Sequence, residues 1–255
     1  MRKNINIIFT VILLVFSFYY THVVSNYIKS KDPIMNKIKE NKKKFESKEI
    51  DAIINNNTII PGKKGIKVNI NASYKKMKRV KKYTESLYVF SYTNPKISIN
   101  NKYDKLIING NKSTNNISIL LKINDINLLI KLKDNTSLNF ILDNTFINDN
   151  VNYLKQINNN IIVLESDYLV NLDIIDYCYS TNSFKQYCSY YNKYTIKPTF
   201  ITNNYYYNTY KLISNGIILS YNIINESNIN DLNIILSYLK TLKYNIVSID
   251  ELIKE

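Results

Sequence analysis

Hydrophobic residues follow two different patterns along this chain: one continuous run near the start, and short alternating runs in the second half. The continuous run extends from Ile7 to Val24 and contains no residue that is charged at neutral pH. A helix rises about 1.5 Å per residue, so this run would reach ~27 Å, close to the ~30 Å hydrocarbon core of a bilayer. The pattern predicts a transmembrane helix within residues 1–27.

From Ser113 onward, short strand-like runs alternate with stretches of helical periodicity. The strand-like runs are 117–123, 137–142, 161–166, 195–202, 216–223 and 245–249. The helices expected among them are 124–135, 148–158, 205–214 and 228–242. Such alternation is typical of parallel βα units. It predicts an α/β fold, with a barrel or an open sheet, over residues 113–255.

Two less regular segments lie between these patterns. Residues 28–57 are rich in Lys and Asn and are expected to form a tether, helical in part. Residues 58–112 predict a small mixed α/β module close to the membrane. Its expected elements are a short helix at 73–80 and strands at 86–92, 96–100 and 105–110.

The flanks of the apolar run bear on how the chain meets a membrane. Arg2 and Lys3 precede it, as in secretory signals and uncleaved signal anchors. We interpret the run as a retained signal anchor, which predicts a single-pass membrane protein with an extracellular C-terminal portion. Cleavage after Ser25 and a buried core helix are the alternatives. Lysines after the run, including Lys29 and Lys31, oppose this orientation, because positive residues favour the cytoplasmic side.

The net charge of +14 is weak evidence about partners, because Lys, Asn, Ile and Tyr are abundant throughout while Trp is absent and Gly totals four. Such a composition is typical of AT-rich codon usage. We predict no nucleic-acid binding, since the basic run at 63–82 carries no recognised nucleic-acid motif. That run could face anionic lipid or a wall polymer, or it could be a merely solvated surface.

The chain's two cysteines, Cys178 and Cys188, lie ten positions apart in a polar, Tyr-rich stretch. In an exported chain a disulfide that closes this loop is expected. Two free thiols, or half of a metal site, are the alternatives.

Three stretches of the second half occur in an order that resembles the polysaccharide deacetylase family. They are FILDNTFINDNVNYLKQI at 140–157, TIKP at 195–198 with the strand after it, and LKTLKYNIVSIDELIKE at 239–255. The resemblance covers residues 113–255. It implies the irregular (β/α) barrel of these carbohydrate esterases, which remove acetyl groups from acetamido sugars by hydrolysis of a C–N bond.

The same resemblance implies a metal site that this sequence lacks in its usual form. The family holds the ion with one Asp and two His and uses a second Asp as base, whereas the one histidine here is His22, inside the apolar run. Asp125 is the only candidate relic of the acidic motif, and Glu165 and Asp167 stand where the histidines are expected. These three acids are weak candidates for a carboxylate-ligated divalent metal. No cofactor is expected, and Lys197 replaces an expected Arg.

Other reactive patterns are missing from the sequence as well, including a Gly-rich phosphate loop, a CxxC pair and a Gly-x-Ser-x-Gly elbow. We therefore predict a membrane-anchored, catalytically degenerate deacetylase-like protein that binds or scaffolds cell-envelope glycan. Tyr205, Tyr206 and Tyr207 are candidates for stacking on sugar rings. The alternatives are an active deacetylase with a carboxylate metal site, and a structural protein that contacts another envelope protein.

Overall fold

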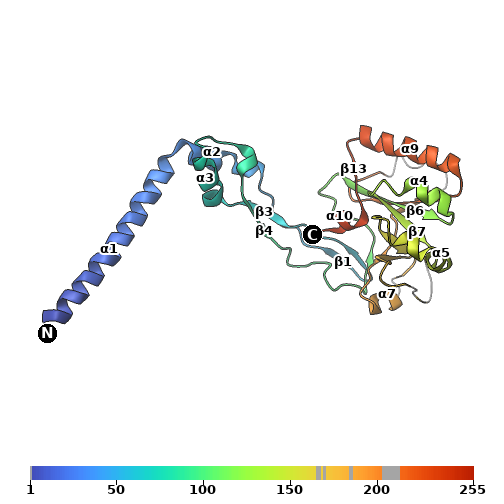
Figure 1. Ribbon diagram of the computed structural model, residues 1–255, viewed down its shortest axis with the longest axis horizontal. Helices are drawn as coiled ribbons and strands as arrows, with labels where there is room; N and C mark the ends of the chain where they lie inside the picture. The colour runs from blue at the N-terminus through green and yellow to red at the C-terminus, as the bar shows by residue number, and fades with distance from the viewer. Residues whose placement is uncertain (1, 165–167, 169–170, 184–185, 203–212) are drawn as a thin grey trace. The chain divides into compact units, whose positions relative to one another are not determined.

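The computed structural model describes residues 2–164, 168, 171–183, 186–202 and 213–255 (Figure 1). The chain forms two compact units, each built from separated stretches. The first unit contains residues 1–49 and 65–93, and the second contains residues 50–64 and 94–255.

Helix α1 (Arg2–Lys31) carries the apolar run of the first unit. Its segment Thr10–Lys31 has a mean hydropathy of 1.5, and none of it is buried. Large apolar side chains such as Phe16 and Phe18 are 67% and 75% exposed. By length and composition this helix is able to cross a membrane.

The rest of the first unit is a small mixed module. Its elements are α2 (Pro33–Asn41), η1 (Lys42–Lys44), β3 (Gly65–Val68), α3 (Ile70–Arg79), η2 (Glu85–Leu87) and β4 (Phe90–Thr93). Strands β3 and β4 pair antiparallel. Ile38, Val68, Met77 and Tyr88 form a small buried core, so α2 and α3 pack on one apolar centre.

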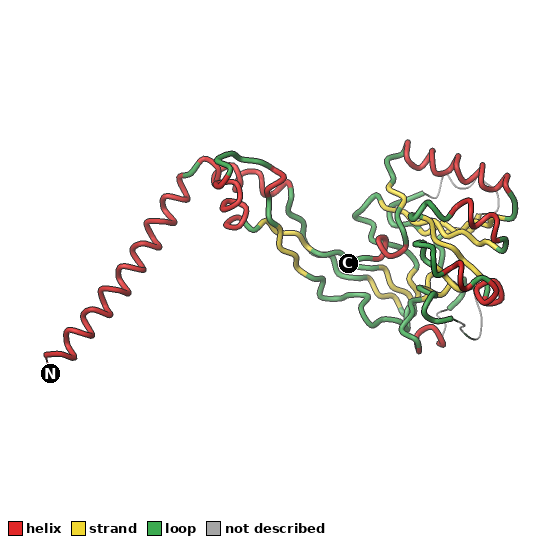
Figure 2. Tube along the Cα trace, in the orientation of Figure 1, coloured by secondary structure: helices red, strands yellow, loops and turns green. Residues whose placement is uncertain are grey.

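The second unit is built on one large sheet (Figure 2). Its strands are β1 (Ile53–Asn55), β2 (Thr58–Ile60), β5 (Leu106–Ile107), β6 (Asn116–Ile123), β7 (Leu138–Leu142), β8 (Ile161–Val163), β9 (Tyr177–Tyr179), β10 (Thr195–Ile196), β11 (Phe200–Thr202), β12 (Ile218–Ile223) and β13 (Asn245–Ile246). Their order is β1-β2-β5-β10-β9-β8-β7-β6-β12-β11, and β13 pairs with the start of β6. All pairs except β1 with β2 are parallel, and within the described residues β11 and β1 are not paired with each other, so the barrel is open.

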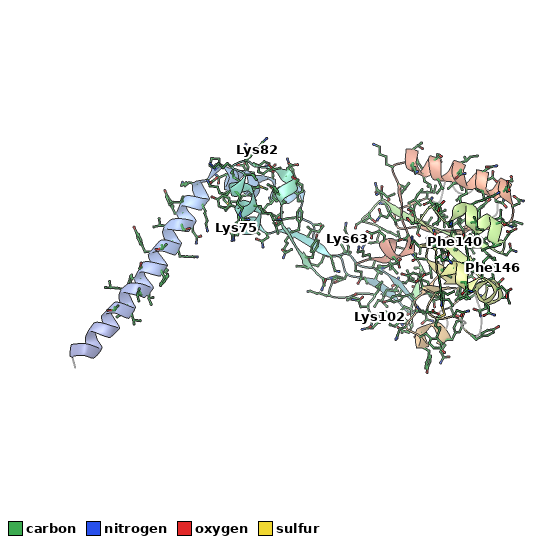
Figure 3. The ribbon with its side chains drawn as sticks, viewed as in Figure 1. Lys63, Lys75, Lys82, Lys102, Phe140 and Phe146 are labelled. Atoms are coloured by element: carbon green, nitrogen blue, oxygen red, sulfur yellow. A yellow bond between two sulfur atoms is a disulfide. The ribbon has the colours of Figure 1, made fainter. Side chains whose placement is uncertain are left out.

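Helices cover the outer face of this sheet. They are α4 (Ile126–Leu132), α5 (Asn144–Asp149), α6 (Val151–Leu154), α7 (Gln186–Tyr190) and α9 (Glu226–Thr241). Because successive side chains of a strand point to opposite faces, Leu121, Phe140 and Leu219 pack outward against these helices, in the core that also holds Leu129 and Leu239. Each βα unit therefore buries its apolar stripe against the sheet, and Phe140 lies at the centre of this layer (Figure 3).

The inner face is filled by a second core and by the short helix α10 (Ile249–Ile253). Leu120, Ile141 and Ile218 point inward, and Leu252 and Ile253 of α10 pack in the same core. Gly110 is required here, because a Cβ atom at this position would lie 2.5 Å from Cγ of Leu252. The interior of the open barrel is therefore solid, with α10 as its plug.

One buried polar group in this interior, Asn139, is completely satisfied. Its Nδ2 donates to Oγ of Ser118 and to the carbonyl of Ile119, both at 2.9 Å. Its Oδ1 accepts from Nδ2 of Asn160 at 3.0 Å and from the backbone N–H of Ile249 at 2.9 Å. Because an unpaired amide in this place would be costly, Asn139 fixes where α10 begins.

The predicted fold class is confirmed, namely an α/β sheet preceded by an N-terminal apolar helix. The prediction of a strand at 96–100 is wrong, since these residues form bends and a turn. Their backbone N–H groups donate to carboxylates instead of to a neighbouring strand. Oδ1 of Asp51 accepts the N–H groups of Lys96 and Ile97 at 2.6 and 3.2 Å, and the carboxylate of Glu255 accepts that of Ile99.

Strand β9 was not expected from the sequence, although it lies in the middle of the sheet between β8 and β10. It carries Cys178, which forms a disulfide with Cys188 of α7, and both cysteines are fully buried. The Cα atoms are 6.4 Å apart. The crosslink joins a short helix of the outer layer to the sheet that it covers.

The division of the chain also differs from the predicted boundary between residues 112 and 113. Strands β1, β2 and β5 belong to the large sheet, so residues 50–64 and 94–112 are part of the second unit. The reason is that Ala52, Ile59 and Ile107 supply one edge of the inner core. Of the predicted module at 58–112, only residues 65–93 belong to the first unit.

We expect Leu252→Ala to destabilise the second unit by ~2–5 kcal/mol, because Leu252 is 4% exposed and its removal leaves a cavity inside the barrel. The measurement is urea unfolding of the full chain in detergent, followed by near-UV circular dichroism. Leu242→Ala is the control, since Leu242 is 44% exposed, and it should change stability by less than ~0.5 kcal/mol. Equal losses in the two variants would contradict the role of α10 as a plug.

Candidate functional site

In parallel α/β barrels, catalytic side chains lie at the carboxyl ends of the strands. Two acids occupy this edge after the neighbouring strands β6 and β7, and both are helix caps. Oδ1 of Asp125 accepts the N–H of Asn127 at 2.7 Å, at the start of α4. Oδ1 of Asp143 accepts the N–H of Phe146 at 2.7 Å and Oγ1–H of Thr145 at 2.6 Å, at the start of α5.

The electrostatics of Asp143 agree with its capping role. The N–H of Phe146, the hydroxyl of Thr145 and the ammonium of Lys122 on the adjacent strand together hold the pKa of this carboxyl below its usual value. The ionised form is therefore stabilised by the fold. Asp143 was not singled out from the sequence, although an Asp that directly follows an apolar strand and precedes a helix is a recognisable cap pattern.

The described residues at this edge do not fit the metal that the fold family implies. Zinc prefers imidazole, thiolate and carboxylate ligands in a closed set of three or four. Among the described residues, no group of three or more His, Cys, Asp or Glu side chains could hold an ion. Asp125 is turned to its own helix, and both cysteines are in the disulfide.

Three further residues were predicted for the metal site or beside it. Glu165 and Asp167 lie outside the described residues. Lys197 follows β10, where its backbone N–H donates to the carbonyl of Ile107 at 2.8 Å and extends the sheet contact to β5. The part of the site that is described thus holds helix caps and strand pairing.

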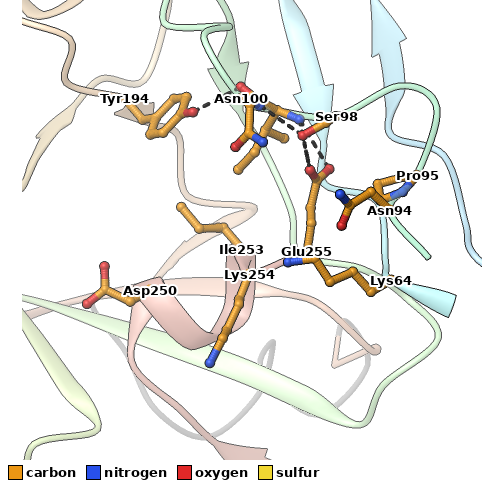
Figure 4. A pocket seen from close by; sticks show the side chains of 11 residues that line it. Lys64, Asn94, Pro95, Ser98, Asn100, Tyr194, Asp250, Ile253, Lys254 and Glu255 are labelled. Carbon is orange, nitrogen blue, oxygen red and sulfur yellow. Dashed lines mark hydrogen bonds between the residues drawn. The ribbon is translucent and has the colours of Figure 1, made fainter. Parts of the chain in front are cut away.

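A well-defined cavity of about 540 Å³ lies within the second unit at the opposite edge, where the strands begin (Figure 4). Tyr194 directly precedes β10, and Asp250 of α10 accepts a hydrogen bond from the hydroxyl of Tyr177, the first residue of β9. The polar residues that line the cavity are Lys64, Asn94, Ser98, Asn100, Tyr194, Asp250, Lys254 and Glu255.

The walls of this cavity are held by specific contacts. The hydroxyl of Tyr194 donates to the carbonyl of Ile99 at 2.9 Å, and the ring lies 4.6 Å from that of Tyr103. Burial raises the pKa of Tyr194 to about 12, so its hydroxyl stays protonated. Glu255 accepts hydrogen bonds from Ser98 and from the N–H of Gly62, the latter at 2.7 Å.

The cavity is lined mainly by polar side chains, and their charges balance. Two ammonium groups, Lys64 and Lys254, are matched by two carboxylates, Asp250 and Glu255. Amide groups supply both donors and acceptors, and an aromatic ring forms one wall. The sequence analysis did not find this site, because its residues come from four separate segments of the chain without a motif. The predicted stacking residues Tyr205, Tyr206 and Tyr207 lie outside the described residues.

Comparison with known proteins shows which structures share this fold. No protein-family model matches the chain. Uncharacterized protein YlxY of Bacillus subtilis is 33% identical over 95 residues, which are 37% of this chain and 30% of YlxY. The matched stretch is thus less than a third of YlxY.

Among solved structures, wild-type BA3943 of Bacillus anthracis, a CE4 family pseudoenzyme, is similar with a TM-score of 0.67 and 18% identity, over 88% of this chain and 96% of its own. A BA3943 mutant with restored enzymatic activity gives the same TM-score and identity, with 99% of its chain covered. The chain therefore has the fold of the CE4 carbohydrate esterases, the class to which polysaccharide deacetylases belong.

We expect Asp125→Ala to destabilise the second unit by about 1 kcal/mol through loss of the α4 cap, whereas Asp125→Asn keeps the cap and most of the stability. Urea unfolding of the full chain in detergent measures both. If both variants unfolded like the unsubstituted chain, the capping role would be contradicted.

We expect Asp143→Asn to lower stability at pH 7, with a difference that closes in acid. Because the pKa of Asp143 is lowered in the folded chain, its charge stabilises the fold above the unfolded-state pKa of about 3.9, and this is lost as pH falls through the folded pKa. Urea midpoints from pH 7 to pH 2.5 provide the measurement. Lys122→Gln should flatten the same pH dependence, and a difference that persisted at pH 2.5 would indicate another cause.

Proposed function

We propose that this protein is a divergent member of the CE4 family that binds cell-envelope glycan without deacetylating it. The proposal is supported by the side chains at the carboxyl edge of the sheet. The fold is that of the CE4 esterases, but Oδ1 of Asp125 and Oδ1 of Asp143 each accept a backbone N–H of the helix that they cap. The sequence contains one histidine, His22 in α1, so no second histidine is present to complete a zinc site. BA3943, similar over almost its whole length, is itself a pseudoenzyme.

The cavity at the amino edge is the glycan site that we propose. Sugars present hydroxyl groups to amides and carboxylates, and they pack their apolar C–H faces on aromatic rings. Tyr194 offers such a ring beside Asn94, Asn100 and Asp250. A volume of about 540 Å³ is within the ~300–1,000 Å³ usual for small-ligand pockets and suits a mono- or disaccharide unit of a polymer.

We propose further that α1 is retained as a membrane anchor and that the second unit lies outside the cytoplasm. The disulfide between Cys178 and Cys188 supports this placement, because such bonds persist in oxidising compartments. The apolar, unburied surface of α1 supports the anchor.

The proposal predicts binding without hydrolysis. The full chain in detergent is titrated with N-acetylglucosamine oligomers and with soluble peptidoglycan fragments, and binding is followed calorimetrically. Tyr194→Leu should weaken binding about fivefold, because an aromatic contact of this kind contributes ~1 kcal/mol. Tyr92→Leu is the matched control, since Tyr92 is 63% exposed on the first unit, and it should bind like the unsubstituted chain.

The same samples are assayed for acetate release with added zinc, manganese or calcium. No release above the background of denatured protein is expected. Metal-dependent release that is lost in Asp125→Ala would instead establish an active deacetylase with a carboxylate site. Absence of both binding and release would favour the structural alternative, a protein that contacts another envelope protein.

A further inference from the structure

A groove of about 470 Å³ lies in the first unit, where the apolar helix α1 approaches α3. It is lined by Lys29 of α1 and by Asn71, Tyr74, Lys75, Lys78 and Arg79 of α3. Four of these six side chains are cationic. The segment from residue 63 to 82, which includes α3, contains no acid.

The groove is held in place by one acid, Asp32, which directly follows α1. Its Oδ1 accepts the N–H of Ile34 at 2.9 Å as the N-cap of α2. Its Oδ2 accepts the hydroxyl of Tyr74 at 3.0 Å and pairs with the ammonium of Lys78. The Asp32 side chain is only 10% exposed, and it connects the start of α2 to two side chains of α3. Helix α3 is thereby fixed against the last turn of α1.

The position of the groove along α1 sets its depth in a bilayer. Lys29 lies five residues beyond Val24, the last residue of the apolar run, or ~7.5 Å along a helix axis. The polar layer on each side of the hydrocarbon core is about 5–8 Å thick. When the apolar run fills the core, the groove therefore lies at the level of the lipid head groups.

The groove is chemically amphiphilic. Its lining combines the methylene stems of the lysines and the ring of Tyr74 with ammonium and guanidinium groups. A guanidinium binds phosphate through two parallel hydrogen bonds, and basic groups next to a membrane attract anionic lipids. We propose that this groove binds the head group of one anionic phospholipid, with its phosphate at Lys75 and Arg79. The inference rests on the proposed membrane anchor and not on the glycan function.

The test uses the full chain purified in a neutral detergent. Native mass spectrometry measures how many lipid molecules stay bound as phosphatidylglycerol, or phosphatidylcholine of the same acyl chains, is added. The double variant Lys75→Gln, Arg79→Gln removes two charges from the groove. The matched control, Lys76→Gln with Lys82→Gln, removes two charges from nearby positions that do not line it. Lys75 and Lys82 lie well apart on this unit (Figure 3).

We expect one retained phosphatidylglycerol, weaker retention of phosphatidylcholine, and at least about tenfold weaker phosphatidylglycerol binding in the groove variant alone. Equal weakening in both double variants would overturn the site in favour of diffuse attraction to a basic surface. Equal retention of the two lipids would also overturn it. Displacement of the lipid by millimolar inorganic phosphate would show a free-anion site instead. Unchanged far-UV circular dichroism in both variants confirms that α3 is intact.

Discussion

Closure of the inner face by residues 249–255 is the contact on which the second unit depends. An open parallel sheet exposes one row of apolar side chains unless something covers it. Here Leu252 and Ile253 pack into that row, and the N–H of Ile249 is fixed by Asn139. Glu255 then accepts hydrogen bonds from two loops far back in the chain, at Gly62 and Ile99. A segment of seven residues thus joins the barrel interior to the edge strands.

The same segment also forms the candidate ligand cavity. Asp250, Ile253, Lys254 and Glu255 line it, and Tyr194 faces them from the start of β10. Closure of the fold and the shape of the cavity therefore have one origin. This arrangement places the cavity of about 540 Å³ away from the carboxyl edge, where barrels of this kind carry their catalytic residues.

Apolar periodicity was sufficient to predict the βα units around β6, β7 and α9, because each buries a long stripe that the sequence displays. It was insufficient where partners lie far apart in the chain. Residues 96–100 look like a strand, yet their N–H groups are accepted by Asp51 and Glu255. Strand β9 is short and carries Tyr and Cys instead of aliphatic residues. The cavity could not be predicted from the sequence for the same reason, because Asn100, Tyr194 and Asp250 come together only in the folded chain.

The helix caps at the carboxyl edge bear on how this lineage changes over time. The resemblance predicts that Asp125 is a relic of a family motif, and in this fold its carboxylate stabilises the start of α4. Selection for stability alone is enough to retain such a residue after catalysis is lost. An acid preserved at a motif position across related chains is then no marker of activity. A zinc site of the usual kind at this edge would require histidines and also a new acceptor for the N–H of Asn127 that Asp125 now binds, so a single substitution would not build one.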